Sequence, residues 1–371
     1  MVRKLTVLQM LPALEGGGVE RGTLEVAKAL VDAGHRSLVM SAGGRMVEEL
    51  LADGSEHFTW PVDRKSLWTL RLVPRLRRFL REQQVDIIHV RSRVPAWVAW
   101  LAWRGMDPAT RPRFVTTVHG LYSVNAYSRI MTRGERVIAV SQTVRDYIEQ
   151  NYPAVDAKVI RVIPRGVDSA SFPYGYHPDD TWMAEWQSAF PRLEGRRLIT
   201  LPGRLTRLKG HHDFVTLIAE LVHGGMDVHG LAVGGEDPRR PAYAREIRNR
   251  IVSEGLEGRI SLLGHRTDMR DIYAVSDLVL SLSTRPESFG RTVLEALSLG
   301  RPVAGYAHGG VGEVLATMYP AGAVRLGDSV ELVQRVREML SHAPPVPREH
   351  PYHLSVMLAS TLAIYEELVS C

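Results

Sequence analysis

Two glutamates spaced eight residues apart give the sequence its strongest chemical signal. Glu287 precedes an expected helix and Glu295 lies inside it, within the segment RPESFGRTVLEA at residues 285–296. A carboxylate can accept hydrogen bonds from both hydroxyls of a vicinal diol, as in a ribose. The start of that helix, near Arg291 and Thr292, presents backbone N–H groups that suit a diphosphate. The segment therefore predicts a site for a phosphorylated sugar ligand.

A second motif supplies positive charge. Arg204 and Lys209 lie in the segment GRLTRLKG at residues 203–210, directly after an expected strand. Open α/β sheets bind ligands at the carboxyl ends of their strands, and two cations there would stabilise a diphosphate leaving group. Taken alone, the two charges are typical of a solvated polar loop. Together with the glutamate segment they favour a binding site.

Two weaker signals lie in the first half of the chain. Three glycines, Gly16 to Gly18, follow the first expected strand and let a backbone approach a phosphate or sugar closely. They do not form Gly-x-Gly-x-x-Gly, because Arg21 stands where the third glycine would fall. His119, followed by Gly120, ends another expected strand, where a histidine is either functional or structural.

The elements that must position these residues alternate between short buried strands and longer amphipathic segments. This alternation predicts parallel sheets with helices on both faces, an α/β fold. The expected strands are residues 5–10, 37–41, 85–90, 114–118, 137–140, 159–163, 198–201, 228–233, 260–263, 278–282 and 303–306. The expected helices are residues 19–33, 66–83, 212–223, 243–255, 291–299, 330–340 and 354–369.

A break in this rhythm predicts two domains. The segment 166–195 contains Pro173, Pro178 and Pro191 with scattered aromatic residues, which indicates an interdomain connection. A chain of 371 residues also exceeds one typical domain. We expect one domain at 1–172 plus 352–371, with the last helix crossing back, and a second at 173–351.

These motifs, with VTTVHG, RVIAVSQTVRDYI, VIPRGVD and the final helix, resemble the GT-B glycosyltransferases of family 4 over nearly the whole chain. The resemblance implies two Rossmann-like domains facing a central cleft and a hexosyltransferase that retains anomeric configuration. The catalytic residues it implies are His119 and Glu287. The residues it implies for donor binding are Gly17, Gly18, Arg204, Lys209, Arg266, Phe289, Gly290, Arg291, Thr292 and Glu295.

The resemblance also implies individual roles. Glu287 would contact the donor-sugar hydroxyls, Glu295 the ribose, and Arg266 the base. Arg204 and Lys209 would hold the diphosphate as it leaves, while the acceptor hydroxyl attacks the same face of the sugar. One residue departs from the family pattern: Arg165 in VIPRGVD, where asparagine is common.

The substrates expected from the resemblance are a nucleotide-sugar, with a UDP-sugar favoured over GDP-mannose, and a glycan or glycolipid acceptor. The segment at residues 119–141 is similar to family members that build lipopolysaccharide or other surface glycans. A GT-B-fold UDP-sugar epimerase is the alternative enzyme. A dehydrogenase is disfavoured because the dinucleotide fingerprint fails.

No cofactor is expected, and no metal. No two aspartates are separated by one residue, so the Asp-x-Asp pair that chelates a metal-bound diphosphate is missing from the sequence. The only cysteine is Cys371, which fits a reducing, cytoplasmic compartment. The apolar start is interrupted by Thr6, Gln9 and Pro12, which favours a buried strand over a signal peptide.

Positive charge is concentrated between residues 64 and 113, which hold 12 basic and 3 acidic residues. Such a region attracts an anionic inner-leaflet surface, a phosphorylated acceptor or nucleic acid. Nucleic acid is disfavoured because no binding motif for it is evident. Trp97, Trp100 and Trp103 follow three apart and would add an interfacial stripe. Peripheral membrane binding and an ordinary solvated, packed surface both remain open.

Overall fold

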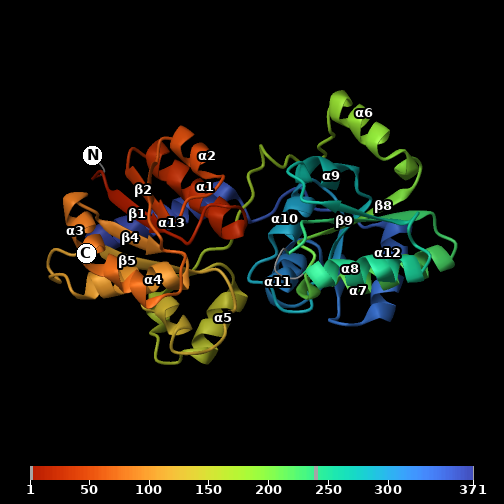
Figure 1. The fold of residues 1–371 in the computed structure, drawn as a ribbon. Coiled ribbons are helices and arrows are strands. Elements are labelled where there is room, and N and C mark those ends of the chain that lie inside the picture. The colour runs from red at the N-terminus through yellow and green to blue at the C-terminus, as the bar shows by residue number, and fades with distance from the viewer. Residues whose placement is uncertain (1–2, 238–240, 371) are drawn as a thin grey trace. The chain divides into compact units, whose positions relative to one another are not determined.

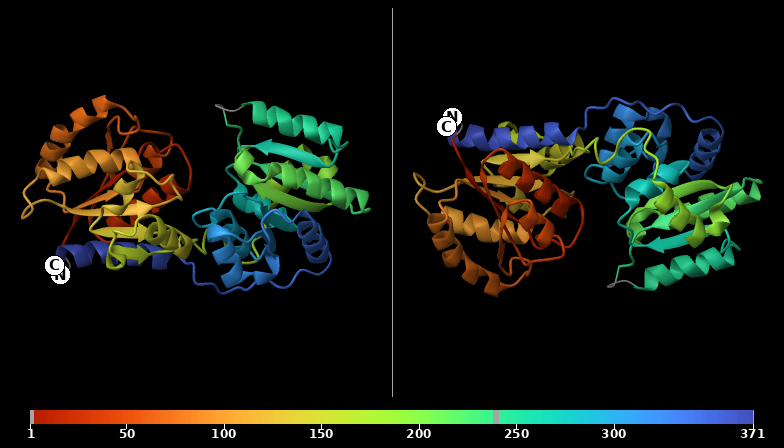
Figure 2. Two further views of the ribbon diagram at one scale, coloured as in Figure 1. Left: turned by 90° about the horizontal axis from the view of Figure 1, so that it is seen from below. Right: turned by 90° about the horizontal axis from the view of Figure 1, so that it is seen from above.

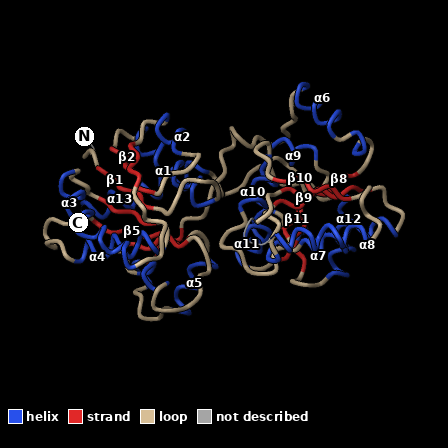
Figure 3. Tube along the Cα trace, viewed as in Figure 1, coloured by secondary structure: helices blue, strands red, loops and turns tan. Residues whose placement is uncertain are grey.

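A computed structural model describes residues 3–237 and 241–370, so Cys371 lies outside the described residues. The chain divides into two compact units, Met1–Arg165 with Ser355–Cys371, and Gly166–Leu354 (Figure 1). The sequence placed these boundaries at 172/173 and 351/352. In each unit the strands form a central sheet with helices around it (Figure 3).

The first unit is built on a seven-stranded parallel sheet in the order β3-β2-β1-β4-β5-β6-β7. The chain moves outward from β1 in one direction and returns to β4 on its other side, which makes β1/β4 the switch point. Strand β4 reads IIHV and is buried throughout, as expected of a strand covered on both faces. The strands are β1 Thr6–Met10, β2 Arg36–Ser41, β3 Glu56–Thr59, β4 Ile87–Val90, β5 Arg113–Val118, β6 Arg136–Ala139 and β7 Ile160–Val162.

The helices of the first unit include the last helix of the chain, α13, which returns to it (Figure 2). Tyr365 of α13 lies with its hydroxyl 2.6 Å from His89 Nδ1 of β4, which fixes the helix against the sheet. The helices are α1 Gly18–Asp32, α2 Val47–Ala52, α3 Leu72–Glu82, α4 Arg93–Arg104, α5 Gln142–Asn151 and α13 Leu354–Ser370. No helix of the described residues has the length and apolar character needed to cross a membrane.

The second unit repeats the plan with a six-stranded parallel sheet in the order β10-β9-β8-β11-β12-β13, so its switch point is β8/β11. The strands are β8 Arg197–Pro202, β9 Val228–Val233, β10 Ile260–Gly264, β11 Leu278–Ser281, β12 Val303–Tyr306 and β13 Ala323–Val324. The helices are α6 Asp180–Ala189, α7 His211–His223, α8 Pro241–Ser253, α9 Met269–Val275, α10 Arg291–Ser298, α11 Gly309–Met318 and α12 Ser329–His342.

Two expectations need correction. The segment 166–195 is not only a connection, because it contains α6, which Asp179 caps by accepting from Trp182 N at 2.8 Å. Trp186 of α6 packs with Leu198 and Leu231 in the core of the second unit. The expected helix at 66–83 is a 3₁₀ turn, Leu67–Arg71, followed by α3.

Candidate active site

The charged residues of the two strongest motifs meet across the switch point of the second unit. Lys209 ends the short 3₁₀ turn Arg207–Lys209 after β8, and Glu287 lies in the loop after β11. Lys209 Nζ lies 2.6 Å from Glu287 Oε1, and both side chains are partly buried. The backbone joins the same two loops, since Thr284 N donates to Leu208 O at 2.9 Å. Residues 78 positions apart therefore form one ion pair at the edge where open sheets bind ligands.

Glu287 is held in the charged form. Burial works to raise the pKa of its carboxyl, but Lys209 and the Ser283 hydroxyl lower that pKa more, so it lies below its ordinary value. Ser283 donates to the same Oε1 atom as Lys209. His308 Nε2 lies 2.7 Å from the Ser283 carbonyl oxygen and ties this loop to the segment after β12. The result is a fixed carboxylate, which can accept hydrogen bonds from ligand hydroxyls.

Glycines make this loop possible. Gly310 N donates to Glu287 O at 2.8 Å, and a Cβ at Gly310 would lie 2.2 Å from Phe289 Cα. Gly290 has φ +98°, a left-handed conformation that favours glycine, and it caps α10. Phe289 is buried and packs edge-on against Tyr352. Phe289 and Gly290 therefore set the path of the backbone in front of α10.

The second glutamate lies one turn into α10. Arg291 Nε lies 3.0 Å from Glu295 Oε1, an i,i+4 pair with both side chains partly buried. Thr292 follows Arg291 in the first turn, where backbone N–H groups have no partner inside the helix. The two glutamates thus lie at different depths, each beside a cation.

The remaining predicted residues of this unit differ in their surroundings. Arg204 is exposed, and among the residues that the structure describes no carboxylate lies within ion-pair distance of it. Arg266 follows β10 and pairs with Asp268, with Nε 2.8 Å from Oδ1. Asp268 also accepts from Trp182 Nε1 at 2.8 Å. Arg266 therefore lies outside the Lys209–Glu287 cluster, held by α6 and the loop before α9.

In the first unit the glycine loop lies at the start of α1. Gly16 and Gly17 have φ values of +147° and +148°, and Gly17 is the N-cap of α1. A Cβ at Gly16 would lie 2.5 Å from Arg45 Nη2, whereas one at Gly18 would meet nothing within 4 Å. The loop is exposed, so its backbone is accessible to a ligand.

His119 follows β5 and is partly buried. Its Nδ1 atom is a hydrogen-bond partner of Arg165 Nη2, and its Nε2 atom is buried with no partner among the described residues. Burial, followed by the positive charges of Arg165 and Arg91 and by His89, holds the pKa of His119 well below its ordinary value. The imidazole is therefore neutral.

A buried polar network that the sequence did not reveal lies under this histidine. Arg91, directly after β4, is 2% exposed and donates through Nε to Gln9 Oε1 of β1 at 2.9 Å. Gln9 Nε2 donates to Thr23 O of α1 at 3.1 Å. His89 Nε2 lies 2.6 Å from Thr117 Oγ1 of β5. The network crosses the β1/β4 switch point, so it mirrors the position of the Lys209–Glu287 pair.

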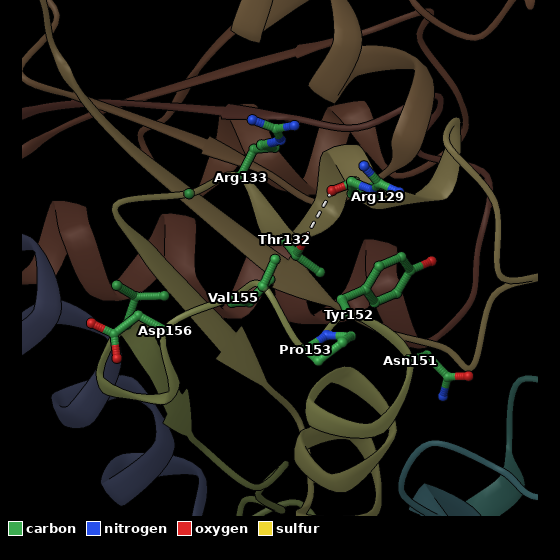
Figure 4. A pocket seen from close by; sticks show the side chains of 11 residues that line it. Arg129, Thr132, Arg133, Asn151, Tyr152, Pro153, Val155 and Asp156 are labelled. Atoms are coloured by element: carbon green, nitrogen blue, oxygen red, sulfur yellow. Dashed lines mark hydrogen bonds between the residues drawn. The ribbon is translucent and has the colours of Figure 1, made fainter.

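Two surface hollows of the first unit lie apart from these residues. One, of about 540 Å³, lies beside the end of α5 and includes Arg129, Arg133 and Tyr152 (Figure 4). The other, of about 340 Å³, is mostly apolar and has Lys65 and Trp97 among its lining residues. Neither contains a residue of the predicted site.

No metal-binding arrangement is present in the described part of the chain, where no three His, Cys, Asp or Glu side chains are grouped to hold an ion. The independence of the reaction from metal stays a prediction.

Two protein-family models match the chain, one in each unit. The model described as Glycosyltransferase Family 4 matches residues 16–171, and that described as Glycosyl transferases group 1 matches residues 196–342. The chain belongs to the family 4 glycosyltransferases. The two matches cover both units and include the glycine loop, His119 and the Glu287–Glu295 segment. The predicted GT-B fold and the hexosyltransferase class are confirmed.

Similar curated proteins include two that carry mannosyl names. Mannosylfructose-phosphate synthase of Agrobacterium fabrum is 31% identical over 48% of this chain and 38% of its own length. The lipopolysaccharide core biosynthesis mannosyltransferase LpcC of Rhizobium leguminosarum is 29% identical over 57% of this chain and 56% of its own length. The matched parts thus span less than two thirds of these relatives.

Solved structures match over nearly the whole chain. A glycosyltransferase of Rickettsia africae superposes with a TM-score of 0.86 at 29% identity, covering 99% of both chains. HepE of Anabaena, solved with UDP and glucose, superposes with a TM-score of 0.80 at 22% identity, covering 97% of this chain and 99% of its own. At that identity the second likeness establishes the fold alone.

Proposed function

We propose that this glycosyltransferase moves a hexosyl group from a UDP-sugar to a glycan or glycolipid acceptor of the bacterial surface, with retention and without a metal ion. The observation that carries the proposal is the Lys209–Glu287 pair at the β8/β11 switch point. A fixed carboxylate for sugar hydroxyls lies there beside a cation for phosphate.

The donor-binding roles follow from the chemistry of each side chain. Glu287, charged and held by Lys209 and Ser283, accepts from the hydroxyls of the transferred sugar. Arg204 and Lys209 balance the diphosphate, and the first backbone N–H groups of α10 add donors to it. Glu295 accepts from the ribose hydroxyls, in exchange for part of its contact with Arg291.

In the proposed reaction the bond between the anomeric carbon and the diphosphate oxygen breaks as negative charge grows on the phosphate. Arg204 and Lys209 stabilise that charge. The acceptor hydroxyl attacks the anomeric carbon on the face that the diphosphate leaves, and its proton passes to a phosphate oxygen. His119 donates through Nε2 to an oxygen of the glycosyl donor and does not act as nucleophile.

Two bases compete for the nucleotide part. HepE was solved with UDP and with UDP-glucose, which supports a UDP-sugar. The mannosyl names of the two curated relatives support GDP-mannose as the rival. The lipopolysaccharide role of LpcC supports a surface-glycan acceptor.

A nucleotide and nucleotide-sugar panel tests the proposal. Because a ligand that binds only the folded form raises its stability, UDP and one UDP-sugar are expected to raise the melting temperature most. Turnover with that sugar should give a glycoside whose anomeric coupling in proton NMR matches the donor. Stabilisation by GDP alone would replace the donor assignment. Consumption of the UDP-sugar with a new UDP-sugar as the only product would establish an epimerase.

Membrane association is the second part of the proposal. Trp97 and Trp103 are half-buried, and their indole N–H groups donate to Tyr127 O and Pro112 O. Among the described side chains of the basic region, the large apolar ones that are exposed are instead Trp68, 66% exposed with Arg71 stacked on it, and Leu70. An exposed indole between arginines suits the headgroup region of an anionic leaflet.

Vesicle co-sedimentation tests this part. Binding is expected to rise with the fraction of anionic lipid and to fall with salt, because each basic residue contributes about 1 kcal/mol near an anionic surface. Trp68→Ala should weaken binding, whereas Trp182→Ala, a tryptophan of the second unit, should not. Binding that ignores lipid charge would reject the membrane hypothesis and favour a phosphorylated acceptor for the basic region.

A further inference from the structure

Arg165, the residue that departs from the family pattern, is enclosed by three elements. It follows β7 and is 9% exposed. Its Nη1 atom lies 3.7 Å from Met357 Sδ of α13, and a Cβ added at Gly22 of α1 would lie 2.9 Å from the same nitrogen. Its other terminal nitrogen, Nη2, bonds to His119 Nδ1. The guanidinium is thus fixed in place by α1, α13 and the loop after β5.

The direction of the Arg165–His119 hydrogen bond follows from chemistry. A guanidinium only donates, so His119 Nδ1 must accept with its lone pair. A neutral imidazole that accepts at Nδ1 carries its proton at Nε2. Nε2 is therefore a donor, and it is buried without a partner in the part of the chain that the structure describes. A buried donor without a partner is rare in proteins and points to an acceptor that a ligand supplies.

The charges around His119 favour the same neutral form. Arg165 approaches from the end of β7, and Arg91 and His89 from β4, while Tyr122 lies in the same loop as His119. Tyr365 of α13 and Glu25 of α1 face Arg91. Protonation of His119 would place a positive charge beside two arginines and would break the hydrogen bond between His119 and Arg165.

We propose that Arg165 is a positioning residue, which fixes His119 as a neutral Nε2–H donor for an oxygen of the glycosyl donor. The identity of that oxygen rests on the proposed function, whereas the fixed tautomer does not. Asparagine, the common residue at this position, has both a donor and an acceptor and so does not dictate the tautomer in the same way. Arginine imposes one.

Gly22 is part of the same arrangement. A glycine inside a helix is less favourable than an alanine, so Gly22→Ala should favour α1 on propensity alone. The added Cβ would instead meet the Arg165 guanidinium, with Cζ at 3.3 Å. The proposal therefore predicts that Gly22→Ala disturbs His119 although it suits the helix. Gly258→Ala, in a turn of the second unit where a Cβ meets nothing within 4 Å, is the control for an added methyl group without a clash.

Imidazole nitrogen NMR of the full chain, labelled at histidine and free of substrate, tests the tautomer. The signal of His119 is assigned by its loss in His119→Gln. It is expected to show the Nε2–H tautomer, and the imidazole is expected to stay neutral at pH values below the ordinary histidine pKa. In Arg165→Met the two tautomers should mix and the titration should move to higher pH. Arg78→Met, which removes an exposed arginine of α3, should leave the signal unchanged.

Unchanged tautomer and titration in Arg165→Met would overturn the positioning role. If that variant fails to fold, Gly22→Ala and Arg165→Gln, whose amide can donate or accept, make the same measurement, and unchanged signals in both would overturn the positioning role equally. Because this arm uses no substrate, its result does not depend on the proposed function.

Steady-state kinetics tests whether the acceptor for His119 Nε2 is an oxygen of the glycosyl donor. Arg165→Met should lower kcat about tenfold, the loss expected for one hydrogen bond, with KM for the nucleotide-sugar little changed, and the acid limb of the pH profile should move up. An altered tautomer with unchanged kcat would reject the glycosyl donor as partner of Nε2.

Discussion

The two units place polar residues at equivalent points of similar sheets but treat charge in opposite ways. In the second unit, Lys209–Glu287 joins the loops of β8 and β11 as a half-buried pair of opposite charges. In the first, Arg91 and Gln9 join β4 and β1, and Arg91 is 2% exposed. The histidines beside it, His89 and His119, have pKa values well below the ordinary range because they are buried near arginines.

This difference in charge indicates how each unit can bind a substrate. The Lys209 and Glu287 side chains are partly exposed, at 30% and 24%, so the phosphates and hydroxyls of a ligand can reach both members of the pair. The buried side chains of the first unit are held by hydrogen bonds to one another and cannot rearrange cheaply, so they present one fixed pattern of hydrogen bonds. The second unit therefore suits recognition by charge and the first suits recognition by geometry.

The greatest loss of activity is expected when the negative charge of Glu287 is removed from the second unit. Glu287→Gln should lower kcat/KM roughly 100-fold, about 3 kcal/mol, because a neutral amide neither pairs with Lys209 nor accepts as strongly from sugar hydroxyls. Steady-state kinetics measures it. Glu338→Gln removes an exposed carboxylate of α12, paired with Arg335, and should stay near the parent. Equal losses in both variants would show a general charge effect and reject the assigned role.

A smaller effect is expected one helical turn away. Glu295→Ala should weaken binding of the free nucleoside diphosphate by about 1–3 kcal/mol, the cost of an unmade charged hydrogen bond. Calorimetric titration of UDP and GDP measures it. If the variant and the parent bind both diphosphates equally, Glu295 does not contact the ribose.

Acid should affect both units, because buried histidines with lowered pKa values lie in the first unit, His89 and His119, and in the second, His211 and His229. Burial lowers the pKa of His211 and of His229 to about 4. Below the ordinary histidine pKa of about 6.5, the unfolded chain binds more protons than the folded chain. The contribution of these histidines to the free energy of unfolding is therefore fully present above that pH and is lost as the pH falls toward 4. Going from about pH 7.5 to 5.5 should cost about 1 kcal/mol per buried histidine.

Chemical denaturation across that pH range measures the slope. His229→Gln, which cannot titrate, should flatten the slope by about one proton. A slope that His229→Gln leaves unchanged would mean that the pKa of this imidazole is the same in the folded and unfolded states, which would contradict the lowered pKa. The Lys209–Glu287 pair should persist over the same range, because the pKa of Glu287 lies below its ordinary value.

The sequence predicted most of the second unit's arrangement because its motifs are contiguous. RPESFGRTVLEA carries both glutamates on nine consecutive positions, and β12 lies at the expected residues 303–306. Helix α11 was missed because Gly309, Gly310 and Gly312 lower helix propensity. Two of these glycines are explained only by the backbone of Glu287 and Phe289, which a Cβ would meet within 3 Å.

The first unit's network could not be predicted in the same way, because its members come from separate strands. Gln9 and Arg91 are 82 positions apart and become neighbours only when β1 pairs with β4. A signal existed in the arginine that directly follows the buried strand at 85–90. Arg165 was noticed only as a departure, since its partner His119 is brought to it by the order β5-β6-β7.

Excess EDTA is expected to have no effect on turnover. A diphosphate leaving group needs positive charge, and in the second unit Arg204 is exposed, Lys209 lies beside Glu287, and α10 offers N–H groups. These groups can supply what a metal ion supplies in Asp-x-Asp enzymes. The assay compares initial rates with and without EDTA, beside a metal-dependent transferase in the same buffer. Loss of turnover that Mg²⁺ or Mn²⁺ restores would contradict the charge-based site of the second unit, because the protein's own cations would then be insufficient.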